Sequence, residues 1–516
     1  MTPRWMTILF GLFGVLLAGA AGAAPGDKAD VVRDLAGRVG PIVGSALACQ
    51  DIARPRIRVI VDKFAAVIKE ASSSEAEREE LTQFLDRSVA DGRGAVTAGK
   101  IDCNIADRQL TDLERSISGP TLAAATAPTS AIVTASAAPA VSTTTRGVSD
   151  REIRFGMAAP FSGAARELGR EMKLGIDTAF NQVNDAGGVN GRMLRLIAAD
   201  DGYEPTRTAE AMKQLYDKDQ VFGIVGNVGT PTAVVAVPYA LERRLLFFGA
   251  FTGASVLRRD PPDRYVFNYR PSYAEETDAV VHYLVKLRRL QPRQIAVFAQ
   301  QDAYGDSGFA GVAKAFRALG AGDGAILRLN YPRNTVDVDD AVKQLKAQKT
   351  PIKAVVMVAT YRAAAKFIEK TRDLYPGMIY TNVSFVGSTA LADELMLLGA
   401  RYATGVIVTQ VVPAVAGYSS MVLEYKNALA KYFPGEAPDY VSLEGYVSAN
   451  ILIQALKRTG PQVDTEKLID TLEGMRNLDL GLGTPLSFGR AEHQASHKIW
   501  GTALDDHGHY QPIELE

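Results

Sequence analysis

The sequence has few of the residue types that build metal cages, and no excess of charge of either sign. It contains two cysteines and five histidines among 516 residues, too few for a set of metal sites. Lys plus Arg total 57 and Asp plus Glu total 58, which gives a formal net charge of -1 at pH 7. No basic field is therefore available to hold nucleic acid or an anionic membrane. We expect no nucleic-acid partner.

Sequence motifs of common enzyme classes are missing as well. The chain has no G-x-S-x-G elbow, no P-loop, no H-E-x-x-H and no G-x-G-x-x-G after a strand. We therefore predict a protein that is not an enzyme and that carries no cofactor. A metal site built from the C-terminal histidines is the less favoured alternative, since His493 and His497, four residues apart, would share a face only on a helix. The other two members of that group are His507 and His509.

Long apolar runs are confined to the N-terminus. Arg4 precedes an apolar run over residues 8–18, and small residues follow at 21–24, which is the order of a secretory signal peptide. We predict that residues 1–23 are the signal peptide, with cleavage after Ala23, and that the mature protein is exported. An uncleaved anchor is the alternative, although the run is shorter than the roughly 20 residues of a spanning helix.

Residues 27–118 have a helical pattern. Apolar residues recur at steps of three and four over residues 57–68 and 81–89, which predicts two or three amphipathic helices. Cys49 and Cys103 lie in this region, and we expect a disulfide between them in an oxidising compartment; two free buried thiols are the alternative. Residues 119–149 are rich in Ala, Thr, Ser and Pro with almost no charge, which is typical of a linker.

From Asp150 onward, predicted strands and helices alternate, which favours parallel sheets covered on both faces. The most informative stretch is Phe222–Ala233, where a buried strand is followed by a glycine-rich turn and a helix start. We predict Thr230 as the N-cap and Pro231 as the first helical residue, so that free N–H groups of the helix would form a small anion site. An ordinary strand-to-helix turn of an α/β protein is the alternative. A second run of the same pattern begins at Ile295 and reaches a strand predicted at Val383–Val386, which implies two similar lobes in series.

Several motifs in this region occur in a characteristic order. They are "NDAGGVNG" at 184, "DDGYEPTRT" at 200, "GIVGNVGTPTA" at 223, "FFGAFTGA" at 247, "VFNYRPSYAEE" at 266 and "QQDAYGDSGF" at 300. The order resembles that of the periplasmic leucine/isoleucine/valine-type solute-binding proteins of ABC transporters, over about residues 150–516. This resemblance implies two doubly wound α/β lobes, joined by three hinge strands, that clamp one small ligand. Lobe 1 would take about 150–271 and 411–483, and lobe 2 about 272–410 and 484–516.

The resemblance also implies a set of ligand-binding residues. The carboxylate-binding positions of the family fall on Thr230, Ala250 and Thr252, and its ligand-covering aromatic residues fall on Tyr304 and Tyr361. A hydroxyl donor beside free helix N–H groups can hold a carboxylate without an arginine. The full set of candidates is Ser162, Gly229, Thr230, Ala250, Thr252, Tyr304, Tyr361 and Thr389.

Two positions depart from the family pattern. Where amino-acid binders of the family have an acidic residue for the ammonium of the ligand, this chain has Gly387-Ser-Thr389 and no carboxylate. Leu168 stands where they often have an aromatic residue. Because an unpaired buried ammonium is costly, these departures favour a carboxylate or amide with an apolar body. Asp302 or Glu275 could supply the missing charge, so amino acids stay open.

The resemblance thus implies a monomeric periplasmic protein that binds an amino acid, amide or organic acid and delivers it to the membrane permease of an ABC importer. A sensing module that presents the bound ligand to a membrane receptor is the alternative. The sequence does not assign a role to the helical module.

Overall fold

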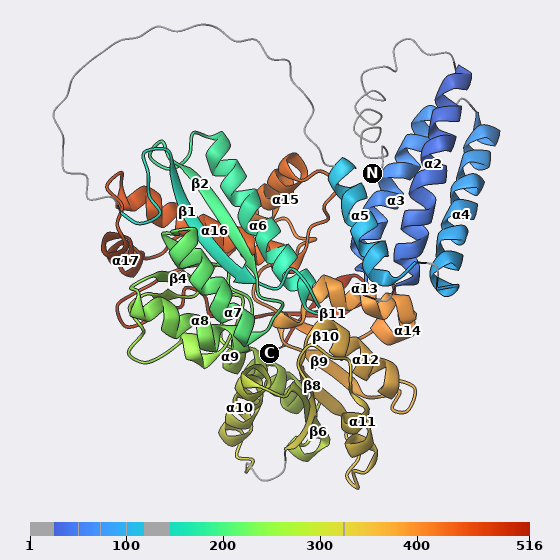
Figure 1. Cartoon of the computed structure of the whole chain (residues 1–516). Coiled ribbons are helices and arrows are strands. Elements are labelled where there is room, and N and C mark those ends of the chain that lie inside the picture. Colours follow the sequence, from blue (N-terminus) through green and yellow to red (C-terminus); the bar gives the residue numbers. More distant parts are fainter. Residues whose placement is uncertain are drawn as a thin grey trace, which may run out of the picture. The chain divides into compact units, whose positions relative to one another are not determined.

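The computed structural model describes residues 25–117, apart from 50, 73 and 100, and residues 145–515, apart from 323–325. The signal-peptide prediction and most of the linker prediction fall outside these residues. The chain divides into two compact units, residues 1–141 and 142–516, which we describe separately (Figure 1). No helix within the described ranges is long and apolar enough to span a membrane.

The N-terminal unit contains four helices in its described part, one or two more than the sequence predicts. They are α2 (Pro25–Ala48), α3 (Arg54–Ala71), α4 (Glu75–Thr97) and α5 (Cys103–Ile117). Helix α2 is easily missed because Pro41 lies inside it, where proline is normally unfavourable. A Cβ atom at Gly44 would lie 1.9 Å from the carbonyl oxygen of Val89, so glycine allows α2 and α4 to approach closely. A disulfide joins Cys49 and Cys103, whose Cα atoms are 5.5 Å apart.

Lobe 1 of the larger unit is built on a five-stranded parallel sheet. Its strand order is β2-β1-β3-β4-β5, and the strands are Met193–Asp200, Glu152–Ala159, Gly223–Val225, Leu246–Phe248 and Val266–Phe267. The helices that follow β1, β2 and β3 are α6 (Arg166–Asp185), α7 (Pro205–Lys213) and α8 (Thr230–Glu242). Three later helices return to this lobe, and α15 and α16 pack against α6: α15 (Ser420–Tyr432), α16 (Tyr440–Thr459) and α17 (Thr465–Gly474).

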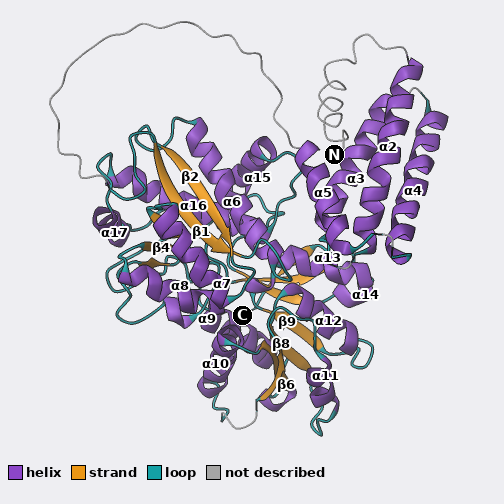
Figure 2. Ribbon diagram, in the orientation of Figure 1, coloured by secondary structure: helices purple, strands orange, loops and turns teal. Residues whose placement is uncertain are grey.

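Lobe 2 has a seven-stranded sheet in the order β12-β11-β10-β9-β8-β6-β7. Its strands are Tyr510–Ile513, Trp500–Leu504, Ile407–Gln410, Ile379–Asn382, Ala354–Val358, Ile295–Gln300 and Leu327–Tyr331. Five of them are parallel, while β11 and β12 add an antiparallel ribbon at one edge. Helices cover the sheet (Figure 2): α9 (Tyr273–His282), α10 (Ala303–Ala318), α11 (Asp339–Lys346), α12 (Tyr361–Thr371), α13 (Ser388–Leu398) and α14 (Ala400–Ala403).

The prediction of a strand at Val383–Val386 is wrong. The strand is β9, four residues earlier, and Ser384–Val386 form a 3-10 turn that leads into α13. Each segment mixes apolar with polar residues and is largely buried, so a buried turn and a buried strand cannot be separated here by composition alone.

The chain crosses between the lobes three times, and the crossings adjoin one another. The N–H of Asn268 donates to the carbonyl of His493, and the N–H of Ser496 donates to the carbonyl of Tyr269, at 2.7 and 3.0 Å. The hydroxyl of Tyr269 donates to the carbonyl of Val411 at 2.7 Å. The three crossings therefore form one hydrogen-bonded hinge, as the three-strand hinge of the predicted fold requires.

Candidate functional site

The loops that follow β3 and β4 pair with each other at the carboxyl end of the lobe 1 sheet. The N–H of Phe251 donates to the carbonyl of Asn227 at 2.7 Å, and the N–H of Gly229 donates to the carbonyl of Phe251 at 3.1 Å. Gly229 has φ 109°, a conformation that favours glycine. The paired loops bring the start of α8 beside the segment 249–252. Ligands of open α/β sheets bind at this edge.

Thr230 and Thr252 meet at this point. Their hydroxyl oxygens are 2.7 Å apart, and both side chains are buried. The prediction of Thr230 as the N-cap is wrong by one residue: Gly229 is the N-cap, and Thr230 is the first residue of α8. The hydroxyl of Thr230 therefore does not cap the helix and instead forms a hydrogen bond with the hydroxyl of Thr252. Ala250 is buried in the same loop, and its carbonyl accepts from the N–H of Thr252 at 2.9 Å.

Aromatic side chains from both lobes gather next to the threonine pair. Phe385 lies at their centre, with ring centroids of Tyr304 at 4.7 Å and Phe251 at 5.1 Å. Tyr203 and Tyr273 lie further out, at 6.1 and 6.4 Å. All five rings are buried. The sequence predicts Tyr304 in this position but none of the other four.

Tyr203 has an unusual backbone conformation. Its φ is 62°, which is costly for a bulky residue and common at functional sites. A Cβ atom at Gly229 would lie 2.3 Å from the ring of Tyr203, so the ring covers the turn before Thr230. Its hydroxyl accepts from the amide of Gln300, in lobe 2, at 3.1 Å. Burial raises the pKa of Tyr203 well above its ordinary value, and Asp302 adds to the increase. The phenol is therefore neutral.

A second polar contact between the lobes lies near Tyr203. Arg333, which follows β7 in lobe 2, donates to Glu204 of lobe 1 at 2.8 Å and to Asp302 of its own lobe at 3.1 Å. The amide of Asn334 donates to Glu204 at 2.5 Å and to the carbonyl of Gly202 at 3.1 Å. We call Glu204, Arg333 and Asn334 the interlobe latch, because their bonds form only when the lobes lie together.

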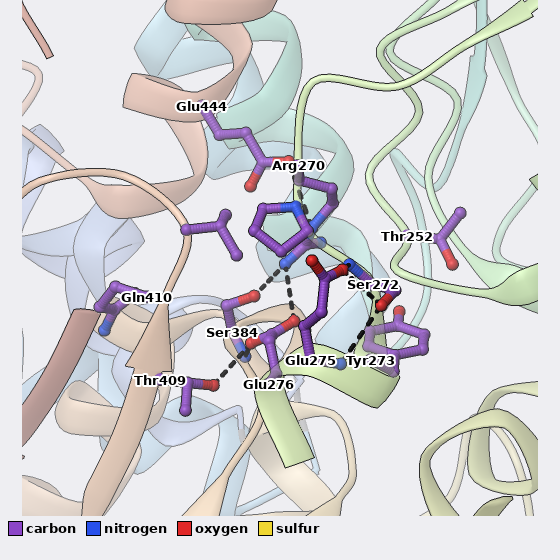
Figure 3. Close-up of polar contacts among 12 residues, drawn as sticks. Thr252, Arg270, Ser272, Tyr273, Glu275, Glu276, Ser384, Thr409, Gln410 and Glu444 are labelled. Atoms are coloured by element: carbon purple, nitrogen blue, oxygen red, sulfur yellow. Dashed lines mark hydrogen bonds and ion pairs between the residues drawn. The ribbon is translucent and has the colours of Figure 1, made fainter. Parts of the chain in front are cut away.

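Arg270 occupies the first crossing and is fully buried (Figure 3). Its guanidinium donates to Ser384 and lies 3.5 Å from Glu276 in lobe 2 and 3.5 Å from Glu444 of α16 in lobe 1. Glu276 also accepts from the hydroxyl of Thr409 at 2.6 Å. The cation therefore bridges carboxylates of both lobes.

The two carboxylates are held differently. Glu276 accepts from both Thr409 and the N–H of Ser384, the latter at 2.8 Å, whereas Glu444 has only the distant guanidinium of Arg270 among its described contacts. Burial raises the pKa of Glu444 to about 7, against the opposing effect of Arg270. Glu444 can thus exchange a proton near neutral pH.

Arg258 fastens the threonine loop to the hinge. It donates to the carbonyl of Thr252 at 3.2 Å, to that of Arg270 at 2.8 Å and to the side chain of Gln494 at 2.7 Å. Gln494 belongs to the third crossing, which the bridge to Asn268 defines. Arg258 therefore connects the candidate ligand loop to two of the three crossings.

The remaining candidates lie apart from the threonine pair. The hydroxyl of Ser162 donates to Asp200 at 2.6 Å on the surface of lobe 1. Tyr361 is buried next to Gly387, at 3.5 Å from the position of an added Cβ atom there, and Leu168 of lobe 1 lies at 2.6 Å from the same position. Leu168, Tyr361 and Gly387 thus form a further contact between the lobes, and this one is apolar.

Thr389 faces a carboxylate that sequence reasoning does not find. Burial raises the pKa of Asp439, the N-cap of α16, and a hydrogen bond from the side chain of Thr389 opposes this increase. Asp439 also accepts from the N–H of Val441 at 2.5 Å. It lies 50 residues further along the chain, so no local pattern could have connected it with Thr389.

The two acids that the sequence offers as ammonium partners are engaged elsewhere. Asp302 accepts from Gln300 at 2.7 Å and from Arg333. Glu275 accepts from Ser272 in the capping box of α9 and contacts His497 at 2.6 Å, which holds its pKa at about 2 in spite of its burial. In this conformation both carboxylates are therefore engaged by other side chains of the protein rather than free for the ammonium of a ligand.

The C-terminal histidines do not share a helix face. Residues 489–499 contain no helix, and the ring of His493 stacks on Phe267 at 3.8 Å. In the described part of the chain, three metal-ligating groups come close together only at Asp505, Asp506 and His507, in the turn between β11 and β12.

Four residues of the site were missed from the sequence: Tyr203, Phe251, Tyr273 and Phe385. Each lies directly after, or one turn beyond, a buried strand or crossing, and aromatic residues in such positions are also common in ordinary cores. A signal does exist for Tyr203, because it stands in the turn "DDGYEP", where a large residue is less expected than glycine or asparagine.

Comparisons with known proteins identify the family and the fold. The family model described as periplasmic binding protein matches residues 152–509. Leu/Ile/Val-binding protein homolog 3 of Brucella melitensis biotype 1 is 25% identical over 339 residues, which cover 64% of this chain and 86% of that protein. An amino acid binding protein of Pseudomonas aeruginosa is 24% identical over 319 residues, covering 60% and 79%.

Solved structures give the same result. One described as a possible leucine/isoleucine/valine-binding protein from Rhodopirellula baltica SH 1 has 39% identity and a TM-score of 0.67, and the match covers 72% of this chain and 99% of that one. The branched-chain amino acid transporter substrate binding protein of Streptococcus pneumoniae, solved with isoleucine, has 18% identity and a TM-score of 0.59, with 70% and 100% covered. The second likeness concerns the fold alone.

Proposed function

Because the chain belongs to the periplasmic binding protein family, we propose that its larger unit clamps a small solute with a carboxylate or amide group between the two lobes. The solute is an amino acid or a related organic acid, and the protein delivers it in the periplasm to the permease of an ABC importer. The names of the relatives, which include Leu/Ile/Val-binding and amino acid binding proteins, support this class of solute.

The observation that carries the proposal is the buried hydroxyl pair of Thr230 and Thr252. The two oxygens lie 2.7 Å apart at the N-terminus of α8, so they bind each other in this conformation and can turn to an incoming carboxylate. The aromatic cluster around Phe385 supplies apolar cover for the body of the solute. The three-strand hinge allows the lobes to open and close around it.

The test is a thermal-shift and calorimetric screen of the mature full-length protein. The screen compares L-leucine, 4-methylpentanoate, which lacks the ammonium, and 4-methylpentanamide, which also lacks the carboxylate, together with a wider set of amino acids and small acids. A compound at about 100 times its Kd adds about 2.7 kcal/mol to the free energy of unfolding. We expect 4-methylpentanoate to bind at least as tightly as L-leucine, because Asp302 and Glu275 are engaged elsewhere.

The variant that tests the site is Thr230→Val with Thr252→Val. Each lost bond to a charged group costs roughly 1.5 to 3 kcal/mol, so the affinity for the best acid of the screen should fall by at least about tenfold per hydroxyl. Thr232→Val is the matched control, since the hydroxyl of Thr232 is buried in the same turn and donates to the carbonyl of Val228 at 2.6 Å. A double variant that binds as tightly as the parent would refute the proposed site.

A further inference from the structure

The hydroxyl of Tyr273, beside the threonine pair, has no partner of normal hydrogen-bond geometry among the described residues. Its side chain is fully buried. Figure 3 shows the ring next to Thr252, with the hydroxyl on the side that faces the threonine. A buried hydroxyl without a partner is unfavourable, and such groups in native proteins call for an explanation.

The ring of Tyr273 is held firmly in this place. Tyr273 is the first residue of α9, whose start is fixed by a capping box between Ser272 and Glu275. Its N–H donates to the carbonyl of Gly253 at 2.8 Å. A Cβ atom at residue 253 would lie 2.7 Å from Cδ1 of the ring, so the ring packs directly on the glycine that follows Thr252. The ring therefore cannot turn away while α9 keeps its first turn.

The surroundings of the hydroxyl suit a donor to an anion. Burial raises the pKa of Tyr273 to about 12, while the charge of Arg270 and the hydroxyls of Thr252 and Thr230 act in the opposite direction. The phenol thus keeps its proton at neutral pH and lies within electrostatic reach of both threonines. On the other side, the rings of Tyr304 and Phe385 close the space at 5.3 and 6.4 Å.

We propose that Tyr273 is a third ligand-binding residue, which donates its phenolic hydrogen to the same acid group that Thr230 and Thr252 bind. This inference rests on the proposed function and extends it, because neither the sequence motifs nor the family resemblance places a ligand contact at residue 273. Three hydroxyl donors can be satisfied by the two oxygens of a carboxylate, which accept several hydrogen bonds. An amide offers one acceptor oxygen, so Tyr273 makes the site selective for an acid over the corresponding amide.

The experiment compares Tyr273→Phe with Tyr269→Phe in the mature full-length protein. Both tyrosines are fully buried in or next to the first crossing, but the hydroxyl of Tyr269 has a partner, the carbonyl of Val411 at 2.7 Å. The probes are 4-methylpentanoate and 4-methylpentanamide, and the readouts are affinity by calorimetry and Tm of the protein without added probe.

We expect Tyr273→Phe to weaken the binding of 4-methylpentanoate about tenfold, to narrow the preference for the acid over the amide, and to leave the Tm unchanged or higher. Tyr269→Phe should lower the Tm and leave the affinity unchanged. An unchanged affinity in Tyr273→Phe would overturn the inference. The inference would also be overturned if Tyr273→Phe lowered the Tm as much as Tyr269→Phe does, because the hydroxyl of Tyr273 would then have a partner within the protein. The Tm is measured without a bound probe.

Failure of the inference is distinguishable from failure of the proposed function. If the parent binds 4-methylpentanoate or L-leucine, and only the Tyr273→Phe result is negative, the clamp stands without its third donor. If the parent binds no member of the whole screen, the solute-binding proposal fails, and the role of Tyr273 fails with it.

Discussion

Breaking the interlobe latch should shift the protein toward an open conformation. The change is Arg333→Ala with Asn334→Ala, which removes the two side chains of lobe 2 that bind Glu204 of lobe 1. The bond from Arg333 to Asp302 is also lost, but it lies within lobe 2 and contributes equally to the open and closed conformations. Only the bonds that cross between the lobes alter the closure equilibrium.

The size of the effect follows from exposure. The side chains of Arg333 and Glu204 are 24% and 38% exposed, so their attraction is partly screened by water and is worth about 1 kcal/mol. The bonds of Asn334 add about 1 kcal/mol. Together they make the closed conformation about 2 kcal/mol less favourable, which reduces the ratio of closed to open protein roughly 30-fold. If the closed conformation is the one that retains solute, Kd for 4-methylpentanoate rises by up to the same factor.

Small-angle scattering and calorimetry measure these two quantities. The matched control is Arg328→Ala, since the side chain of Arg328 is 25% exposed and pairs with Asp306 inside lobe 2. The control should leave both the radius of gyration and Kd unchanged. If the latch variant scattered and bound like the parent at low and high salt, closure would depend on the buried contacts alone, and the reasoning on the latch would be wrong.

Two further predictions concern stability. The pKa of Glu444 is about 7 in the folded protein against an ordinary value of 4.5, so the native state keeps a proton that the unfolded chain loses. The contribution of Glu444 to the free energy of unfolding should therefore fall by up to about 3 kcal/mol as the pH rises from about 4.5 to 7, and stay constant above pH 7. Denaturant titrations at several pH values measure this dependence, and Glu444→Gln should remove it. An equal pH dependence in the parent and in Glu444→Gln would contradict the prediction. Cys49→Ser with Cys103→Ser opens a loop with a sequence separation of 54, which should destabilise the helical module by about 4 kcal/mol and leave the calorimetric transition of the larger unit in place. A shift of that second transition would show that the two units are coupled.

The sequence was most informative where periodicity and turn residues agreed. Strand β8 is an unbroken apolar run that begins directly after Lys353, a pattern that favours a buried strand. Helix α8 begins within one residue of its predicted start, because Gly229 permits the positive φ of the turn and Pro231 fixes φ in the first turn of the helix. The two-lobed architecture, implied by the order of the motifs, is confirmed by the matching structures.

The features that could not be predicted from the sequence depend on contacts between residues that are distant in the chain. Thr389 lies near Asp439 only because α13 of lobe 2 packs against α16 of lobe 1, and Tyr203 contacts Gln300, which lies 97 residues further along the chain. Local patterns describe which residues are buried but not which buried residues meet. The position of Tyr273 shows the same limit, since its significance comes from an unsatisfied hydroxyl that no pattern of residue types reveals.

Lobe 2 is completed after lobe 1 during synthesis, because its antiparallel ribbon, β11 and β12, follows the last helix of lobe 1 in the chain. Strand β11 pairs with β10, and Thr502 bonds to the carbonyl of Val408 from 94 residues away, while all helices of lobe 1 have been made by Gly474. A chain that stopped at Arg490 would therefore have a nearly whole lobe 1 and a lobe 2 with β10 as an open edge, and open edges are prone to pair with other chains. We expect a chain truncated before β11 to aggregate rather than merely to lose binding, and a tag to be tolerated far better outside the sheet than within β11 or β12.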